Sequence, residues 1–126
     1  MAYAGDLTIY GLDVSVYTWI VRCVCAEKNQ SFKTVSVNPF AAEPDPVLAA
    51  FSPFNRMPVL VHGAFALFET HAITRYLDRA FPVPLLTPET PTAEARMAQV
   101  ISIIDSYGNW TMVRQVFSEA DFKPLY

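Results

Sequence analysis

Residues 52–77 decide the fold that this sequence predicts, and they read SPFNRMPVLVHGAFALFETHAITRYL. Two β-prone runs in this stretch, 59–61 and 65–68, flank the segment His62-Gly63-Ala64, which indicates a β-hairpin. The apolar residues behind the hairpin recur with the spacing of one helix face; they are Ala72, Ile73, Tyr76, Leu77 and Ala80. The stretch therefore predicts two antiparallel strands followed by a helix.

The first part of the chain predicts a strand followed by a helix. Residues 7–10 form a short β-prone run that Gly11 ends. From residue 17 to residue 25 the apolar positions follow a helical spacing. Ser15 stands just before this apolar face, where the N-cap of the helix is expected.

A second strand follows this helix. Residues 32–37 alternate in the manner of a strand, and Asn38-Pro39 closes them. The chain up to Pro53 is a proline-rich loop with one helical turn at 47–51. A helix that joins two strands makes them parallel, whereas the hairpin strands pair antiparallel. The fold class is therefore α/β, with a thioredoxin-like mixed four-stranded sheet in the order β-α-β-α-β-β-α.

A proline-rich segment separates this fold from the end of the chain. Four prolines fall between residues 81 and 91, which indicates a linker, and we place it at 83–91. The sequence thus predicts a thioredoxin-like domain at 1–82 and a helical segment at 92–126.

The helical segment has its own start signal. Thr90 followed by Pro91 is the pattern of an N-cap with proline at the first helical position. A long helix is expected from there toward Phe117. Gly108-Asn109 falls inside it, so we expect a local weakening or kink at that point.

Composition narrows the class of protein. Hydrophobic residues make up 52% of the chain and charged residues 17%, which favours a folded core over disorder. The net charge is -3 and no Lys/Arg cluster is present, so no nucleic-acid partner is expected. No apolar run approaches the roughly 18 residues of a membrane-spanning helix, and no signal peptide is recognisable. A cytoplasmic protein without a membrane partner is predicted.

Cysteine and histidine residues indicate neither a redox motif nor a metal site. Cys23 and Cys25 are spaced C-x-C on the predicted helix, so they point to different faces, and Cys25 falls on the apolar one. A thioredoxin redox site needs C-x-x-C instead. His62 falls in the predicted hairpin turn and His71 in the first turn of a helix. Neither has a third ligand nearby in the sequence, so no metal is expected.

Four segments, in this order, resemble the soluble glutathione transferases: IYGLDVSVYTWIVR (9–22), SPFNRMPVL (52–60), LFETHAITRYL (67–77) and ARMAQVISIIDSYGNWTMVRQVF (95–117). The first three look like the family's active-site loop, cis-proline strand and third helix. The fourth looks like the first helix of its all-helical second domain. The resemblance therefore implies an N-terminal thioredoxin-like domain and an incomplete helical domain, in a chain that looks truncated. Within the family, the chain resembles the serine-type classes, which are the tau and phi classes or their bacterial counterparts.

The resemblance implies attack of the glutathione thiolate on an apolar electrophile, with glutathione as co-substrate and no metal. A free thiol has a pKa of about 8.5, so the site must stabilise the thiolate. A hydroxyl at a helix N-terminus offers a hydrogen bond and a favourable dipole, and Ser15 fits. Ser15 is also a good helix cap, and the two roles are compatible. Tyr10, Tyr17 and Thr18 are the alternative hydroxyls, although both tyrosines also suit packing.

The same resemblance assigns the residues that hold glutathione. A cis Met57-Pro58 bond implies that the Met57 backbone pairs with the cysteinyl part, although a trans proline could also open a strand. Thr70 and the helix N-terminus face the γ-glutamyl carboxylate, and Glu69 faces its α-ammonium group, unless both only cap the helix. Arg56 either pairs with the glycyl carboxylate or is a solvated surface residue.

The predicted last helix adds candidates for the second substrate. The resemblance implies that Tyr107 and Trp110 line the electrophile pocket and that the protein forms a homodimer. Equally, these side chains are apolar surface that needs a neighbour. An alternative function is a non-catalytic module that keeps the fold for binding. A thiol-disulfide oxidoreductase is not favoured, because Val14-Ser15 stands where it would need a cysteine.

Overall fold

The computed structural model describes residues 5–122, with side chains as far as residue 116. Contacts divide the chain into two compact units, Met1–Leu85 and Leu86–Tyr126, and each is described by itself. The elements of the first unit are β1 (Leu7–Tyr10), α1 (Val16–Glu27), β2 (Phe32–Val35), α2 (Pro46–Phe51), β3 (Val59–His62), β4 (Phe65–Phe68) and α3 (Thr70–Ala80). The second unit contains α4 (Pro91–Ile103) and η1 (Ile104–Phe122).

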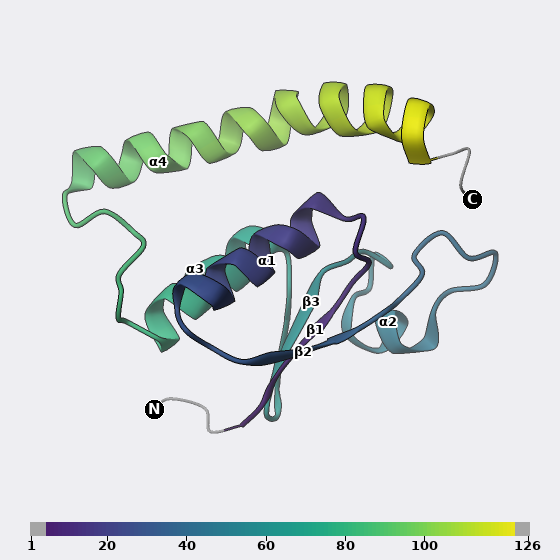
Figure 1. Ribbon diagram of the computed structural model, residues 1–126, viewed down its shortest axis with the longest axis horizontal. Helices are drawn as coiled ribbons and strands as arrows, with labels where there is room; N and C mark the ends of the chain where they lie inside the picture. Colours follow the sequence, from purple (N-terminus) through teal and green to yellow (C-terminus); the bar gives the residue numbers. More distant parts are fainter. Residues whose placement is uncertain (1–4, 123–126) are drawn as a thin grey trace. The chain divides into compact units, whose positions relative to one another are not determined.

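The first unit is built on one mixed sheet with the strand order β2-β1-β3-β4 (Figure 1). β1 pairs with β2 in parallel, and β3 pairs antiparallel with both β1 and β4. This topology confirms the predicted thioredoxin-like sheet and element order. Val59 of β3 lies opposite Tyr10 of β1 on one side and Phe68 of β4 on the other, which fixes the ends of three strands at one edge of the sheet.

The alternation of side chains along the strands gives the sheet two apolar faces. Helices α1 and α3 pack against each other and cover one face. The buried cluster beneath them consists of Leu7, Ile9, Val21, Cys25, Leu60, Ile73 and Leu77. The short helix α2 contributes Leu48 to a second cluster, with Val37 and Val59 and the ring of Tyr10 packed against it. The core therefore has the helix–sheet–helix layering expected of this topology.

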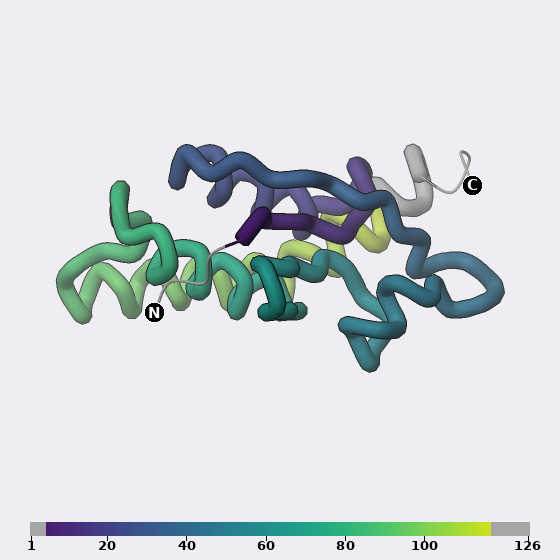
Figure 2. The backbone as a smooth tube through the Cα atoms, turned by 90° about the horizontal axis from the view of Figure 1, so that it is seen from below, coloured from purple at the N-terminus to yellow at the C-terminus, as the bar shows by residue number. Residues whose placement is uncertain are grey.

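The helix α2 interrupts the long loop between β2 and β3, which Figure 2 shows reaching out beyond the sheet. Asp45 caps this helix, and its carboxylate accepts from the backbone N–H of Val47 at 2.9 Å and of Leu48 at 3.1 Å. It also accepts from Asn38 N, and these bonds, that of Leu48 above all, hold the pKa of the Asp45 carboxyl below its usual value. The cap confirms the predicted helical turn and ties its start to Asn38 in the loop that follows β2.

Two predicted strand boundaries are wrong. The second strand ends at Val35 rather than at residue 37, because Val37 turns away from the ladder to fill the cluster under α2. His62 is not a turn residue, because it pairs with Leu7 and Phe65 at the end of β3 and is buried. Its Nδ1 lies 2.7 Å from the Tyr76 hydroxyl, so the histidine ties the hairpin to α3.

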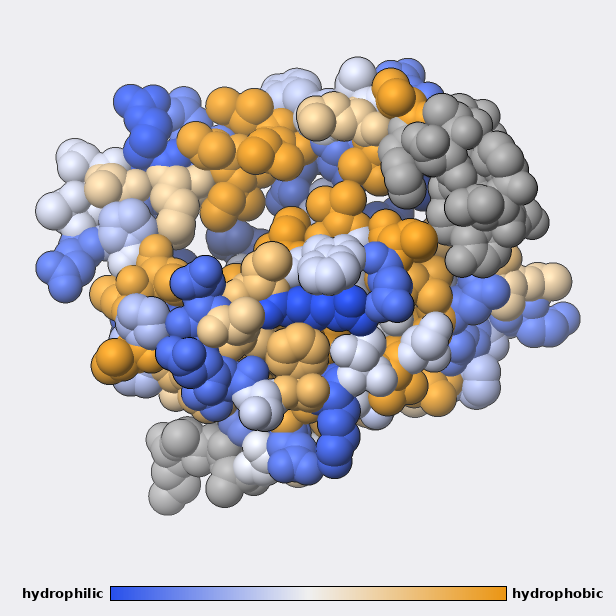
Figure 3. All heavy atoms as spheres, viewed as in Figure 1, coloured by the Kyte–Doolittle hydropathy of each residue, from blue (hydrophilic) through white to orange (hydrophobic). Residues whose placement is uncertain are grey.

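In the second unit, α4 and η1 follow one another without a break, and the helix geometry changes along their length. Thr90 caps α4 and Pro91 opens it, as predicted. The backbone then takes π-helical geometry from Ile104, four residues before the predicted weak point at Gly108. Several large apolar side chains on this helix are exposed: Val100, Ile103, Ile104, Tyr107, Trp110, Met112 and Val116. Figure 3 shows apolar residues, in orange, at the surface of the molecule. Within the described residues, no helix has the length and apolar character needed to cross a membrane.

A buried ion pair joins α1 to α3 at the end remote from Ser15. Lys28, the C-cap of α1, bonds to the Asp78 carboxylate, and the two side chains are 0% and 5% exposed. The Lys28 ammonium also donates to the carbonyl oxygens of Asp78, at 3.4 Å, and of Pro84. A buried charge is tolerated only with such a full set of partners. The pair therefore fixes the two helices and the chain that follows α3 to one another.

We predict that the substitution Asp78→Asn lowers the free energy of unfolding by about 3 kcal/mol, because it leaves the Lys28 charge buried without its counter-ion. The matched control is Asp6→Asn, which breaks the exposed Lys33–Asp6 pair of 3.0 Å and is expected to cost less than about 1 kcal/mol. Urea denaturation followed by circular dichroism measures both. Equal losses in the two variants would contradict the role given to the buried pair.

Candidate functional site

One edge of the sheet gathers the predicted glutathione-site residues of the first unit. β1 and β4 end there and β3 begins there, because Tyr10, Val59 and Phe68 share one register position. The chain that leaves β1 starts α1 within six residues, and the chain that leaves β4 starts α3 at once. Two helix N-termini therefore open on this edge, and both carry the partial positive charge that suits an anion.

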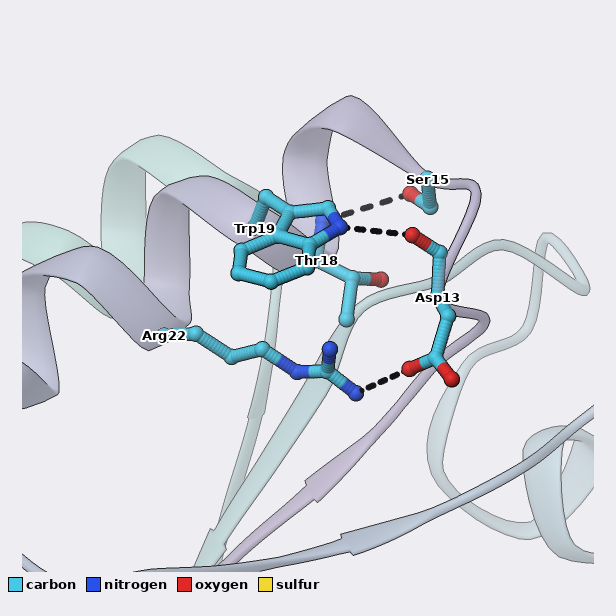
Figure 4. Close-up of polar contacts among 5 residues, drawn as sticks. All are labelled: Asp13, Ser15, Thr18, Trp19 and Arg22. Atoms are coloured by element: carbon cyan, nitrogen blue, oxygen red, sulfur yellow. Dashed lines mark hydrogen bonds and ion pairs between the residues drawn. The ribbon is translucent and has the colours of Figure 1, made fainter.

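Ser15 stands at the first of these helix N-termini. Its backbone is extended, with φ -81° and ψ 118°, and its hydroxyl oxygen accepts from Thr18 N at 3.2 Å (Figure 4). The predicted cap is thus confirmed. The side chain is half-buried. A hydroxyl can accept two hydrogen bonds and donate one, so the cap leaves the Ser15 proton available to a ligand.

The alternative hydroxyls have other surroundings. Thr18 is fully buried, and a Cβ at residue 11 would come within 2.3 Å of its hydroxyl oxygen, so α1 can pack this closely only on Gly11. The Tyr10 ring packs on Phe51 with centroids 5.6 Å apart, on the face that α2 covers. Tyr17 is half-buried in the first turn of α1. Ser15 is therefore better placed than Thr18 or Tyr10 to meet a ligand.

The loop before β3 is held from several sides. The Met57–Pro58 peptide bond is cis, as predicted, and Pro58 is buried. Arg56 N donates to the Ser52 hydroxyl, and the Asn55 amide donates to the Pro39 carbonyl oxygen, each at 3.2 Å. The Arg56 side chain is exposed. The Met57 backbone thus enters the edge from a fixed loop, while the Arg56 side chain is open to solvent.

Glu69 has an unusual backbone between β4 and α3. Its φ is +71°, in the left-handed region that favours glycine, and its side chain makes no cap bond to the helix. Such a conformation costs free energy and is common where a ligand is clamped. Thr70 begins α3 and is half-buried, whereas the Glu69 side chain is exposed. Glu69 and Thr70 are therefore held at the edge with polar groups available for a ligand.

Two predicted site residues belong to the second unit. Tyr107 and Trp110 lie on η1, where their side chains are 71% and 61% exposed. Both rings are available for an apolar contact, and the assignment of the electrophile pocket to them stays a prediction.

One polar cluster near Ser15 escaped the sequence analysis. The indole N–H of Trp19 donates to the Asp13 carbonyl oxygen, and the Arg22 guanidinium pairs with the Asp13 carboxylate, each at 2.6 Å (Figure 4). Arg22 also lies over the Trp19 ring, 5.1 Å from its centre. An aspartate before a helix and an arginine two turns into it were the signal available for this cluster.

Cysteines and metal-ligating residues do not join this site. Cys25 belongs to the core under α1, and burial raises the pKa of its thiol to about 11, whereas Cys23 is exposed. Among the described residues, no three histidine, cysteine or acidic side chains gather as a metal site.

A family model supports the fold and the order of the site segments. The model of the glutathione S-transferase N-terminal domain matches residues 9–90. This chain belongs to the glutathione S-transferase family.

Relatives of this family member carry two kinds of name. Glutathione S-transferase 3 of Zea mays is 38% identical over 104 residues, which cover 82% of this chain and 47% of that protein. The stringent starvation protein A homolog of Coxiella burnetii is 36% identical over 90 residues, 71% of this chain and 42% of that protein. The chain thus spans less than half the length of these two curated relatives.

A solved structure agrees with the fold. The theta class glutathione S-transferase from Xanthomonas axonopodis pv. citri, crystallised with glutathione bound, superposes with a TM-score of 0.71 at 25% identity. The superposition covers 82% of this chain and 50% of that one. This similarity supports the thioredoxin-like architecture of the family member described here.

We predict that native protein at neutral pH exposes one reactive thiol. The Cys25 thiol, with its pKa of about 11, holds almost no thiolate below pH 9. Titration with a chromogenic disulfide should therefore modify Cys23 rapidly and Cys25 only after denaturation. The variant Cys23→Ser should show no rapid phase, and rapid labelling of that variant would contradict the burial of Cys25.

Proposed function

We propose that this chain binds glutathione at the sheet edge and that the Ser15 hydroxyl stabilises its thiolate for conjugation to an apolar electrophile. The observation that carries the proposal is the meeting of Ser15, the cis Met57–Pro58 bond and Thr70 at one edge, between two helix N-termini. The bound glutathione in the Xanthomonas structure supports the same ligand.

The chemistry follows from these groups. Ser15 donates its proton as a hydrogen bond to the glutathione sulfur, while its oxygen keeps the bond from Thr18 N. A donor that is aimed at a developing anion stabilises the thiolate, and the thiol proton is released to solvent. The thiolate sulfur then forms a bond to the electrophilic carbon as the bond from that carbon to its leaving group breaks, and the leaving group departs with the electron pair. Ser15 acts as a hydrogen-bond donor throughout, so its own ionisation is not required.

The peptide part of glutathione would bind to groups on both sides of Ser15. The Met57 backbone pairs with the cysteinyl residue as a short antiparallel strand would. The N-terminus of α3, with Thr70, receives the γ-glutamyl carboxylate, and Glu69 lies near the α-ammonium group. The exposed Arg56 side chain can reach the glycyl carboxylate.

The proposal also covers the second substrate and the properties of the whole protein. Tyr107 and Trp110 would supply apolar contacts to the electrophile, and their exposure supports that use. A homodimer, a cytoplasmic location and a detoxification role go with a transferase of this family. We include all three in the proposal.

A second candidate is a non-catalytic module that keeps the fold for binding. The relatives named as stringent starvation protein A homologs favour it, because their name does not describe a transferase. The two candidates differ in one measurement, the conjugation of a chromogenic electrophile. Retention on immobilised glutathione without turnover would favour the module.

We predict that Ser15→Ala lowers kcat/KM for conjugation by about a hundredfold near neutral pH, because the thiolate loses its donor. The thiol pKa of bound glutathione should rise, as followed by the ultraviolet absorbance of the thiolate. Retention on immobilised glutathione should change little, since the peptide contacts remain.

Ser15→Ala also removes a helix cap, so a matched control is needed. Thr90→Ala removes the cap of α4, where the Thr90 hydroxyl accepts from Ala93 N at 3.4 Å, and should leave the thiol pKa unchanged. Ser15→Asp keeps a capping oxygen without a proton to donate and should be as inactive as Ser15→Ala. Unchanged turnover in Ser15→Ala would reject this serine as the donor.

A further inference from the structure

We propose that Asp13, Trp19 and Arg22 form a brace that positions Ser15 for its encounter with the glutathione sulfur. The inference rests on the proposed function, because it concerns the geometry of the same hydroxyl. Their side-chain bonds run among the three residues rather than to the Ser15 hydroxyl, and Trp19 N donates to the Ser15 carbonyl oxygen at 3.1 Å within the helix, so we assign them a positioning role rather than a catalytic one.

The brace acts on the loop that joins β1 to α1. At its start the loop is tethered to the sheet by the bond from Gly11 N to the Val35 carbonyl oxygen at 3.0 Å. Ser15 N closes a turn on the Leu12 carbonyl oxygen at 3.1 Å. Asp13 lies between these two points and would otherwise be free, since its side chain is 84% exposed.

Two bonds from α1 reach Asp13 from the same helix face. Trp19 and Arg22 are three residues apart, so their side chains are neighbours on that face. One bond goes to the backbone of Asp13 and the other to its carboxylate, both at 2.6 Å. Because Asp13 is bonded through both its backbone and its side chain, neither its position nor its orientation can change easily. Ser15 is only two residues further along the chain, so its position is restrained as well.

Arg22 has the surroundings of a structural anchor. Its side chain is only 13% exposed, and it is stacked on the Trp19 ring. A guanidinium buried to this degree needs a counter-ion, and Asp13 is the carboxylate that pairs with it in the structure. Its Nε atom is buried with no partner among the described residues, so the bond to Asp13 matters all the more. The ion pair between the buried Arg22 guanidinium and Asp13 thus holds the loop in place.

The consequence is mechanistic. A hydrogen bond to a thiolate weakens steeply when its donor moves away or loses alignment. Displacement of a reacting group by about 1 Å can cost two orders of magnitude in rate. Loosening the brace should therefore reduce kcat more than it raises KM, because the peptide of glutathione is held by other segments.

The test compares Arg22→Met, Asp13→Asn and the double variant. We expect each single variant to lower kcat/KM about tenfold, which is less than the roughly hundredfold loss that a displacement of about 1 Å can cause. The thiol pKa of bound glutathione should rise in both, with little change in KM. If the residues act as one brace, the double variant loses no more than the worse single variant. Additive losses would overturn the proposal.

Two further variants separate positioning from general destabilisation. Lys33→Met breaks the exposed Lys33–Asp6 pair and should leave kcat, KM and the thiol pKa unchanged. Arg22→Lys keeps the charge but not the planar fork or the stacking, so it should restore only part of the loss. A full loss in Lys33→Met would assign the effect to stability, and so would a normal thiol pKa in Arg22→Met.

Hydrogen exchange distinguishes failure of the inference from failure of the proposed function. Faster exchange of the amides of residues 12–15 in Arg22→Met, with unchanged exchange in β1, is the expected result. If wild-type protein neither binds nor conjugates glutathione, the proposed function fails, and the exchange data still report whether the brace holds the loop. Unchanged exchange in Arg22→Met overturns the brace itself.

Discussion

β1 and β3 run antiparallel with Tyr10 opposite Val59, and the chain on either side of this pair forms the candidate site. The strand β1 leads into the Ser15 loop, while the cis Met57–Pro58 bond leads into β3. A shift of this register by one residue would turn every side chain of β3 to the other face. Leu60 would then leave the core under α1 and α3, and the two segments would no longer meet. Burial of the core and assembly of the site therefore depend on the same pairing.

The two ends of the α1–α3 layer are stabilised in different ways. At the C-terminal end of α1, Lys28 and Asp78 are almost fully buried and bond to each other and to the carbonyl oxygen of Pro84. At the other end, the mostly buried Arg22, two turns into α1, pairs with Asp13 in the loop before the helix, and Asp13 is exposed. The first arrangement is closed to solvent. The second holds a loop while leaving it reachable from solvent, as a ligand-binding edge requires.

Sequence reasoning succeeded where the signal is local. The cap at Ser15, the proline that opens α4 and the hairpin before α3 each depend on neighbouring residues, and all were predictable. Contacts between distant residues were not: the Lys28–Asp78 pair spans 50 residues and has no local pattern. His62 was misplaced because the turn composition around Gly63 gave no sign that pairing with Leu7 would extend β3. Family resemblance identified the site segments, but the Asp13–Arg22 contact depends on how the loop folds back over α1.

Magnitudes show why one serine at a helix N-terminus is sufficient for the proposed chemistry. A hydrogen bond to a charged group contributes about 1.5–3 kcal/mol, whereas the helix dipole contributes about 0.3–1 kcal/mol. One pKa unit corresponds to about 1.36 kcal/mol, so the two effects together lower a thiol pKa by roughly one to three units. A thiol that starts near about 8.5 then has a pKa between roughly 5.5 and 7.5, and thiolate is its major form at neutral pH once the shift exceeds about 1.5 units. Most of that shift comes from the hydrogen bond, which depends on alignment, and alignment is what the cap bond to Thr18 N and the Asp13 contacts supply.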